Sequence, residues 1–209
     1  MKICSVEKYK GSTFCVEFCS GERVYLDSGI VSDYNLKADM DIPEQALAEV
    51  VTANDTRRAR ERALYLLSSR DFSYKELFEK LEQNYDEEVC YTICNRMAEL
   101  GLINDQRYAE KLARTLFEVK RVGMYKAKQE MRLKGLSDEL IGQAVSEYEE
   151  STADRLEELV DKKYARYLTD DKGVKKVKSA LTRLGYSYGD INAVLELYDL
   201  DFDEFDEDE

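Results

Sequence analysis

Residues 104–148 read NDQRYAEKLARTLFEVKRVGMYKAKQEMRLKGLSDELIGQAVSEY, and this stretch decides the fold. Its apolar residues recur with the 3.6-residue period of a helix in three successive segments. Asn104 can cap the first segment and Ser137 the third. Gly135 follows the second segment, where a left-handed residue ends many helices. The stretch therefore predicts a three-helix unit with its own small core.

The same pattern recurs about fifty residues away on both sides. Upstream, Asn54-Asp55 matches Asn104-Asp105, and Asn84 takes the left-handed place of Gly135. Downstream, Gly173 matches Gly123, and Gly185-Tyr186-Ser187 matches Gly135-Leu136-Ser137. Self-similarity at such a period is typical of stacked helical units. The chain is therefore predicted to be mainly all-α, with three tandem three-helix repeats. One irregular helical domain with coincident spacings is the alternative.

The first forty residues follow a different period. Phe14, Val16 and Phe18 alternate with polar residues, as in a half-buried strand, and turn signals stand at Gly11 and Gly21. This predicts a small β-meander. Because three short strands cannot hold themselves together, we expect them to pack on the first helices.

Capping signals and charge mark the expected boundaries. Pro43 suits the first turn of a linker helix. Asn54-Asp55 is predicted to cap the helix that follows it, and Ser73 with Glu76 is predicted to form a capping box at the start of another. Ser151 with Asp154 predicts the start of the third unit. The expected parts are a β-rich segment (1–42), a linker helix with the first unit (43–103), the second unit (104–150), the third unit (151–198) and a disordered acidic tail (199–209).

The composition limits the chemistry. The chain has five cysteines and no histidine, which excludes an ordinary zinc site and a histidine-based catalytic group. Cys90 and Cys94 lie on a predicted core stripe, and Cys15 and Cys19 on one face of a strand, so we expect reduced thiols rather than a disulfide frame. Neither a signal peptide nor a membrane span is recognisable. We expect a cytoplasmic protein without cofactors or metals.

Charge is unevenly distributed along the chain. The net charge is −13, but eight acids and no base lie in residues 199–209. Residues 119–135 and 172–185 each carry +5, whereas the corresponding residues 69–85 of the first unit sum to −1. The basic character therefore belongs to the second helices of the second and third units.

These two helices supply the candidate partner-binding residues. They are Lys126, Lys128, Arg132 and Lys134, with Lys172, Lys175, Lys176, Lys178 and Arg183. Such a surface suits an acidic protein or a phosphate backbone, although exposed lysines also occur on faces that meet only solvent. Helix-turn-helix binding of nucleic acid is the rival reading. It is weakened because the helices after the glycine joints carry Asp138, Glu139 and Asp190 and are not basic.

A family resemblance covers about residues 55–200. It is carried by Arg70-x-Phe72-Ser73-x-x-Glu76-Leu77-x-x-Lys80-Leu81, then by Gly101-Leu102-Ile103-Asn104-Asp105-x-x-Tyr108-Ala109, and then by Gly123 and Lys134-Gly135. In order and spacing these motifs resemble the RecX family of regulatory proteins. The resemblance implies tandem three-helix units in an elongated arc.

The resemblance also implies a partner. RecX proteins regulate the RecA recombinase, so we expect binding in the groove of the RecA filament and suppression of ATP hydrolysis, strand exchange and co-protease activity. This places the protein in DNA repair, homologous recombination and the SOS response, as a monomer and without catalytic residues. Whether single-stranded DNA is a second partner stays open.

Overall fold

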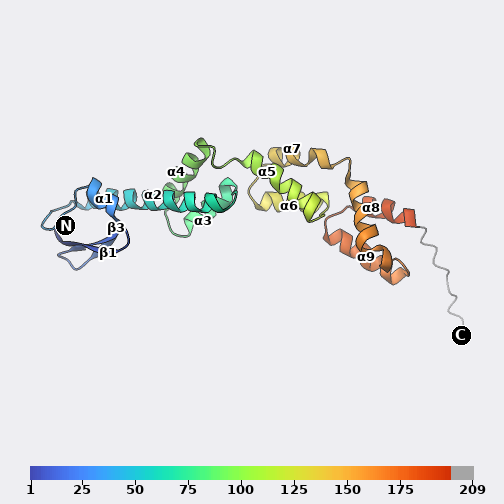
Figure 1. The fold of residues 1–209 in the computed structure, drawn as a ribbon, viewed down its shortest axis with the longest axis horizontal. Helices are drawn as coiled ribbons and strands as arrows, with labels where there is room; N and C mark the ends of the chain where they lie inside the picture. Colours follow the sequence, from blue (N-terminus) through green and yellow to red (C-terminus); the bar gives the residue numbers. More distant parts are fainter. Residues whose placement is uncertain (199–209) are drawn as a thin grey trace, which may run out of the picture. The chain divides into compact units, whose positions relative to one another are not determined.

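The computed structural model describes residues 1–198, and residues 199–209, where the acidic tail is expected, lie outside the described part. The chain, drawn as a ribbon in Figure 1, divides into two compact parts, Met1–Ile103 and Asn104 onward. Each part has two hydrophobic clusters. Helices dominate residues 1–198, and the sheet is confined to the N-terminal 27 residues. The prediction of a mainly all-α fold after a small β-meander is confirmed.

The meander is a three-stranded antiparallel sheet. Its strands are β1 (Ile3–Lys10), β2 (Thr13–Phe18) and β3 (Arg23–Asp27), in the order β1-β2-β3. Gly11 (φ 55°) and Gly21 (φ 88°) form the turns in left-handed conformations that suit glycine. Val16 and Leu26 are buried on one face, and their cluster continues onto Val50 of the following long helix, as expected for a sheet this small.

That helix, α2 (Glu44–Ser69), is uninterrupted. The predicted break, with Asn54-Asp55 capping a new helix, is wrong. Neither glycine nor proline occurs within α2, so nothing in the chain ends it there. Asn54 is buried, and its Oδ1 accepts a 2.8 Å hydrogen bond from the amide of Asp27 at the end of β3. The amide side chain therefore joins the sheet to the helix.

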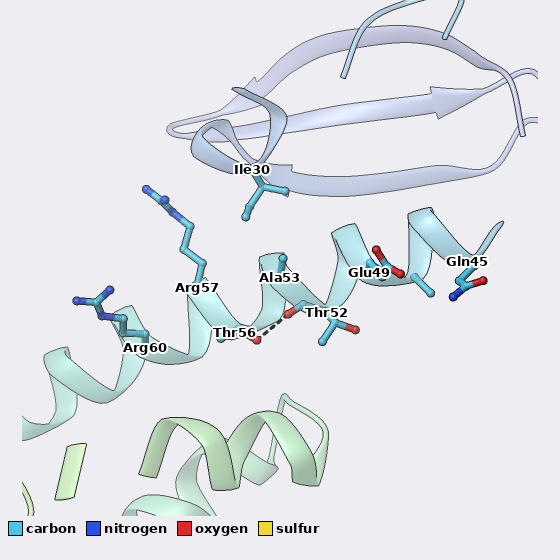
Figure 2. A pocket seen from close by; sticks show the side chains of 9 residues that line it. Ile30, Gln45, Glu49, Thr52, Ala53, Thr56, Arg57 and Arg60 are labelled. Atoms are coloured by element: carbon cyan, nitrogen blue, oxygen red, sulfur yellow. Dashed lines mark hydrogen bonds between the residues drawn. The ribbon is translucent and has the colours of Figure 1, made fainter. Parts of the chain in front are cut away.

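Asp27 is the other half of this junction. Its carboxylate caps α1 (Ser28–Asp33), a short helix that the sequence pattern did not predict, by accepting from the Gly29 amide at 2.9 Å. The same oxygen lies 2.9 Å from Arg57 Nε on α2. Figure 2 shows Ile30 of α1 pointing toward α2. The sheet, α1 and α2 thus share both polar and apolar contacts.

The first three-helix unit combines the end of α2 with α3 (Tyr74–Glu82) and α4 (Glu87–Glu99). Ser73 caps α3 by accepting from the Glu76 amide at 3.1 Å, as predicted. The prediction that Asn84 is left-handed is wrong. The amides of Asn84 and Tyr85 donate back to the Leu81 carbonyl at 2.9 and 3.1 Å, so α3 ends through these bonds without a left-handed residue.

The second unit follows the prediction closely. It consists of α5 (Asp105–Arg114) with a π-helical turn (Thr115–Val119), α6 (Met124–Leu133) and α7 (Asp138–Val145) with a 3-10 turn (Ser146–Tyr148). Asn104 caps α5 by accepting from the Arg107 amide at 2.8 Å, and Ser137 caps α7 by accepting from the Leu140 amide at 3.3 Å. Gly135 has a φ of 81°, the left-handed conformation expected after α6.

The third unit repeats this plan with one difference at its start. It consists of α8 (Thr152–Lys163) with a 3-10 turn (Ala165–Tyr167), α9 (Asp171–Arg183) and α10 (Tyr188–Leu195) with a 3-10 turn (Glu196–Tyr198). Gly185 has a φ of 89°, and Ser187 caps α10 by accepting from the Asp190 amide at 3.1 Å, as expected. α8 begins directly after Ser151, as predicted, but the Ser151 side chain makes no capping bond. Its hydroxyl accepts from Arg155 instead.

Cys4 and Cys19 form a disulfide, which overturns the expectation that all thiols are free. The two cysteines are 15 residues apart in the sequence. The pairing of β1 with β2 brings their Cα atoms to a distance of 5.1 Å, which a disulfide can span. The prediction that Cys15 and Cys19 lie on one face of a strand is also wrong, because β2 ends before Cys19. Cys15 is free and half-buried, and Cys90 and Cys94 are free and buried in the first unit, as predicted for the last two.

Candidate partner-binding surface

Helix α9 presents one basic face. Lys172, Lys176 and Arg183 follow at intervals of four and seven residues, which places them on one side of the helix, and Lys175 lies beside them. Leu181 on the opposite side is fully buried in the core of the third unit. We call Lys172, Lys175, Lys176 and Arg183 the α9 basic stripe. All four are exposed, and the stripe extends about 16 Å along the helix axis.

The charges of this stripe are not neutralised locally. Its three lysines form no ion pair with any of residues 1–198. Arg183 Nε donates to the backbone carbonyl of Ser179 at 3.2 Å. Lys178, the remaining predicted residue of α9, lies on the flank of the helix and is half-buried. Within residues 1–198 the stripe therefore has no ion pair that an acidic or phosphate ligand would have to break.

The predicted basic residues of the second unit do not share one face. They are Lys126, Lys128 and Arg132 on α6 and Lys134 just after it. Lys128 and Arg132 lie on one flank and pair with Glu149 (3.4 Å) and Asp138 (2.8 Å). The other two lie on the opposite flank and are half-buried. Their charge is therefore less available than that of the α9 basic stripe.

Between these flanks α6 exposes a different row. Tyr125, Gln129 and Leu133 recur every four residues, and Tyr125 and Leu133 are 76% and 68% exposed. We call these three residues the α6 crest. The charge of residues 119–135 did not predict this row, because a net charge does not show which side of a helix faces solvent. The crest adds apolar contact area beside the charged flanks.

The second and third units meet where α9 ends and α6 begins. The Gly123 amide donates to the Leu184 carbonyl at 2.8 Å, and the Tyr125 amide donates to the Gly185 carbonyl at 3.2 Å. A Cβ on Gly123 would overlap the backbone of Gly185, and a Cβ on Gly185 would overlap Lys126. Both glycines are therefore needed for this approach, which fixes α6 against the end of α9.

Charged side chains reinforce the junction. Arg121, whose φ of 54° is left-handed, pairs with Glu158 of α8, and its carbonyl accepts a 3.1 Å hydrogen bond from the Tyr186 hydroxyl. Hydrogen bonds from Arg121 and Lys162 lower the pKa of Glu158 to about 2. The sequence offered no signal for this pairing, since the two partners lie 37 residues apart.

Arg155 connects the same two units from the other side. Its guanidinium carbon lies 5.0 Å from the centroid of the Phe117 ring, which stacks on Tyr148 at 4.6 Å. Its Nη2 donates to the Tyr148 carbonyl at 2.8 Å. Burial lowers the pKa of Arg155 and raises that of Tyr148 to about 12. The ring contacts and the hydrogen bond of Arg155 thus join α8 of the third unit to the second unit.

A cavity of about 460 Å³ opens at the start of α9. Its lining includes Tyr164, Arg166, Tyr167, Asp170, Lys172 and Lys176. A Cβ on Gly173 would overlap the Tyr167 carbonyl oxygen, so glycine lets α9 approach the preceding 3-10 turn. The repeat pattern had matched Gly173 with Gly123, but the two glycines make room for different neighbours.

A second cavity, of about 740 Å³, lies along α2 in the N-terminal part (Figure 2). Small and polar side chains line much of it, and the Thr56 hydroxyl donates a 2.8 Å hydrogen bond to the Thr52 carbonyl. Among residues 1–198, no group of three or more acids and cysteines is placed to hold a metal ion. In the same range no helix has both the length and the hydropathy to cross a bilayer.

Comparison with known families matches each three-helix unit separately. Residues 59–97, 104–145 and 149–195 match the family models described as the first, second and third three-helix domains of RecX. Together these segments make up more than half of the chain. The chain belongs to the RecX family.

Individual RecX proteins agree with this assignment over most of their length. The chain is 31% identical to the regulatory protein RecX of Clostridioides difficile over 180 residues, which cover 85% of this chain and 84% of the relative. It is 24% identical to the Streptococcus sanguinis protein over 98% of this chain and 80% of the relative. A crystal structure of RecX from Lactobacillus salivarius superposes with a TM-score of 0.63 and 29% identity, covering 71% of this chain and 99% of that one.

A further RecX crystal structure shares the fold, with a TM-score of 0.65 at 22% identity, and covers 93% of this chain and 98% of that one. The α6 crest and the α9 basic stripe both lie within segments that match the RecX models. The N-terminal sheet and α1 lie outside them. The candidate surface therefore belongs to the part of this RecX protein for which the family match is direct.

Proposed function

We propose that this RecX protein binds the RecA nucleoprotein filament and inhibits its ATP hydrolysis, strand exchange and co-protease activity. It acts by binding, without a catalytic step or a cofactor, as a cytoplasmic monomer. The observation that carries the proposal is the match of all three three-helix units to RecX domains, together with relatives named regulatory proteins.

The contact is proposed to use the nine basic residues of the second and third units, with the α9 basic stripe as its main element. A stripe of exposed cations about 16 Å long can meet several acidic or phosphate groups at once. The α6 crest supplies Tyr125 and Leu133, the aromatic and aliphatic side chains that anchor many protein interfaces. A protein partner uses both features, whereas a phosphate backbone uses only the charges.

Nucleic-acid binding in the helix-turn-helix manner is the weaker candidate. The helices that follow the glycine joints, α7 and α10, begin with the acids Asp138, Glu139 and Asp190. A recognition helix enters the major groove with its N-terminal residues, where acids would face phosphate. Contact of the α9 basic stripe with single-stranded DNA inside the filament is compatible with the main proposal.

Equilibrium binding separates the two functions. The labelled protein is titrated with RecA filaments assembled on single-stranded DNA, with the same DNA without RecA, and with duplex DNA, at several salt concentrations. The proposal predicts tight binding to filaments and weak, salt-sensitive binding to naked DNA. Tighter binding to duplex DNA than to filaments would favour the helix-turn-helix function.

A further inference from the structure

The cavity at the start of α9 is both cationic and aromatic. Arg166, Lys172 and Lys176 line it against one carboxylate, Asp170, which already accepts the Gly173 amide at 2.5 Å. The two lysines are exposed and form no ion pair within residues 1–198. A site with this excess of positive charge favours an acidic ligand.

The aromatic side of the cavity adds a second requirement. Tyr164 and Tyr167 form part of the wall, and Tyr167 is 47% exposed. The Arg166 guanidinium carbon lies 4.7 Å from the Tyr167 ring centroid, so one face of this ring is occupied by a cation of the same chain. Val177 continues the apolar wall on α9. An acidic peptide that also carries aromatic side chains matches both halves of the lining.

Such a peptide occurs in the same chain. Residues 199–209 read DLDFDEFDEDE, with eight acids, two phenylalanines and no base. Tyr198, the residue before this segment, lies near one wall of the cavity, because its hydroxyl donates to Asp161, and Tyr164 follows Asp161 by one helical turn. Counted from Tyr198, Phe202 can reach at most about 14 Å and Phe205 about 25 Å. The longer reach exceeds the path from Tyr198 through its side chain and Asp161 to Tyr164, one helical turn on.

We infer that residues 199–209 bind in this cavity of their own chain, with Phe202 or Phe205 against Tyr164 and Tyr167 and with carboxylates at Lys172 and Lys176. The bound segment covers two of the four residues of the α9 basic stripe. It therefore competes with any acidic or phosphate ligand of the stripe, whichever partner the protein regulates. The inference stands independently of RecA.

The chain contains no tryptophan, which permits a direct test in the full-length protein. F205W introduces a single tryptophan whose emission and acrylamide quenching report its burial. We expect blue-shifted emission and weaker quenching than in a free peptide of residues 199–209 with the same substitution. Adding Lys172→Glu and Lys176→Glu should remove both differences, and so should 1 M salt, where the screening length falls to about 3 Å.

The control carries Lys8→Glu and Lys10→Glu on β1, which change the net charge equally at exposed positions of the N-terminal part. It should keep the buried signal. A second variant replaces the acids of residues 199–209 by their amides, which leaves residues 1–198 untouched, and it should lose the signal. Emission and quenching equal to those of the free peptide in the unaltered F205W protein would overturn the inference. A buried signal that disappears on dilution would also overturn it, since the segment would then bind a second copy.

Discussion

Gly123 and Gly185 lie backbone against backbone, with a 2.8 Å hydrogen bond from the Gly123 amide to the Leu184 carbonyl next to Gly185. The second and third three-helix units are therefore joined by main-chain contacts as well as by side chains. This close approach explains why glycine is needed at both positions. A single added methyl group at either one would disturb the junction.

Gly123→Ala should weaken the junction between the second and third units. The added Cβ overlaps the Gly185 backbone, which cannot rotate away as a flexible side chain can, so we expect a loss of about 1–3 kcal/mol in the free energy of unfolding. Chemical denaturation measures it. Gly142→Ala in α7 is the matched control, because its Cβ meets no atom within 4 Å. It should leave stability unchanged or raise it by roughly 0.5–1 kcal/mol.

Gly185→Ala should cost more than Gly101→Ala. Both glycines are left-handed, with φ of 89° and 69°, so both substitutions carry a similar backbone strain of about 1 kcal/mol. Only at Gly185 does the Cβ also overlap Lys126. The difference between the two unfolding free energies isolates the packing at the junction. Equal losses would show that the close approach contributes nothing beyond the backbone conformation.

Acid should weaken the junction through Glu158. Its pKa is lowered to about 2 by hydrogen bonds from Arg121 and Lys162, below the ordinary value of 4.5. The stabilisation is therefore fully present above pH 4.5 and is lost as the pH falls toward 2. Because the side chain is 43% exposed, salt should reduce the effect. Thermal unfolding between pH 5 and pH 2.5 should show a smaller pH dependence in Glu158→Gln than in the unaltered protein.

The cysteines give a simple test of the N-terminal sheet. Without reductant, the unfolded protein should show three reactive thiols, and after reduction five, because Cys4 and Cys19 are joined. In the folded state Cys15 should react first. Cys94 should stay inert, since burial raises its pKa to about 12 and the thiolate is the reactive form. Five thiols in the unreduced protein would show that Cys4 and Cys19 are not joined.

Local sequence patterns predicted the features that depend on a few adjacent residues. The caps at Ser73, Asn104 and Ser137 and the left-handed Gly135 and Gly185 follow from the chemistry of helix ends, which acts within three or four residues. The same patterns failed at positions where distant contacts compete with a local role. Asn54 is the clearest case, because its side chain meets the Asp27 amide 27 residues away instead of capping a helix.

The candidate surface shows the same limit. The sequence shows the nine basic residues but not which of them are free to meet a partner. Lys128 and Arg132 are paired with Glu149 and Asp138. Lys126 packs against the Gly185 turn. The apolar α6 crest was hidden for a related reason. A helix exposes the side that its neighbours leave uncovered, and those neighbours come from other parts of the chain.

Charge reversal on α9 should weaken filament binding more than charge reversal on α6. Lys175→Glu, Lys176→Glu and Lys178→Glu should lower the affinity for RecA filaments and flatten its salt dependence, because these three lysines form no ion pair within residues 1–198 and their charge is available to a ligand. The comparison variant carries Lys126→Glu, Lys128→Glu and Lys134→Glu. Circular dichroism checks that helicity is kept. An unchanged affinity and salt slope in the α9 variant would mean that these lysines meet only solvent.

The rate of ATP hydrolysis by RecA tests the central proposal most directly. RecA is assembled on single-stranded DNA with ATP, and this protein is added from far below to well above the RecA concentration. If one molecule binds in the filament groove across several RecA subunits, as proposed, hydrolysis should fall at near-stoichiometric or lower ratios. Hydrolysis that stays unchanged in a large excess of the protein would rule out the proposed inhibition of RecA.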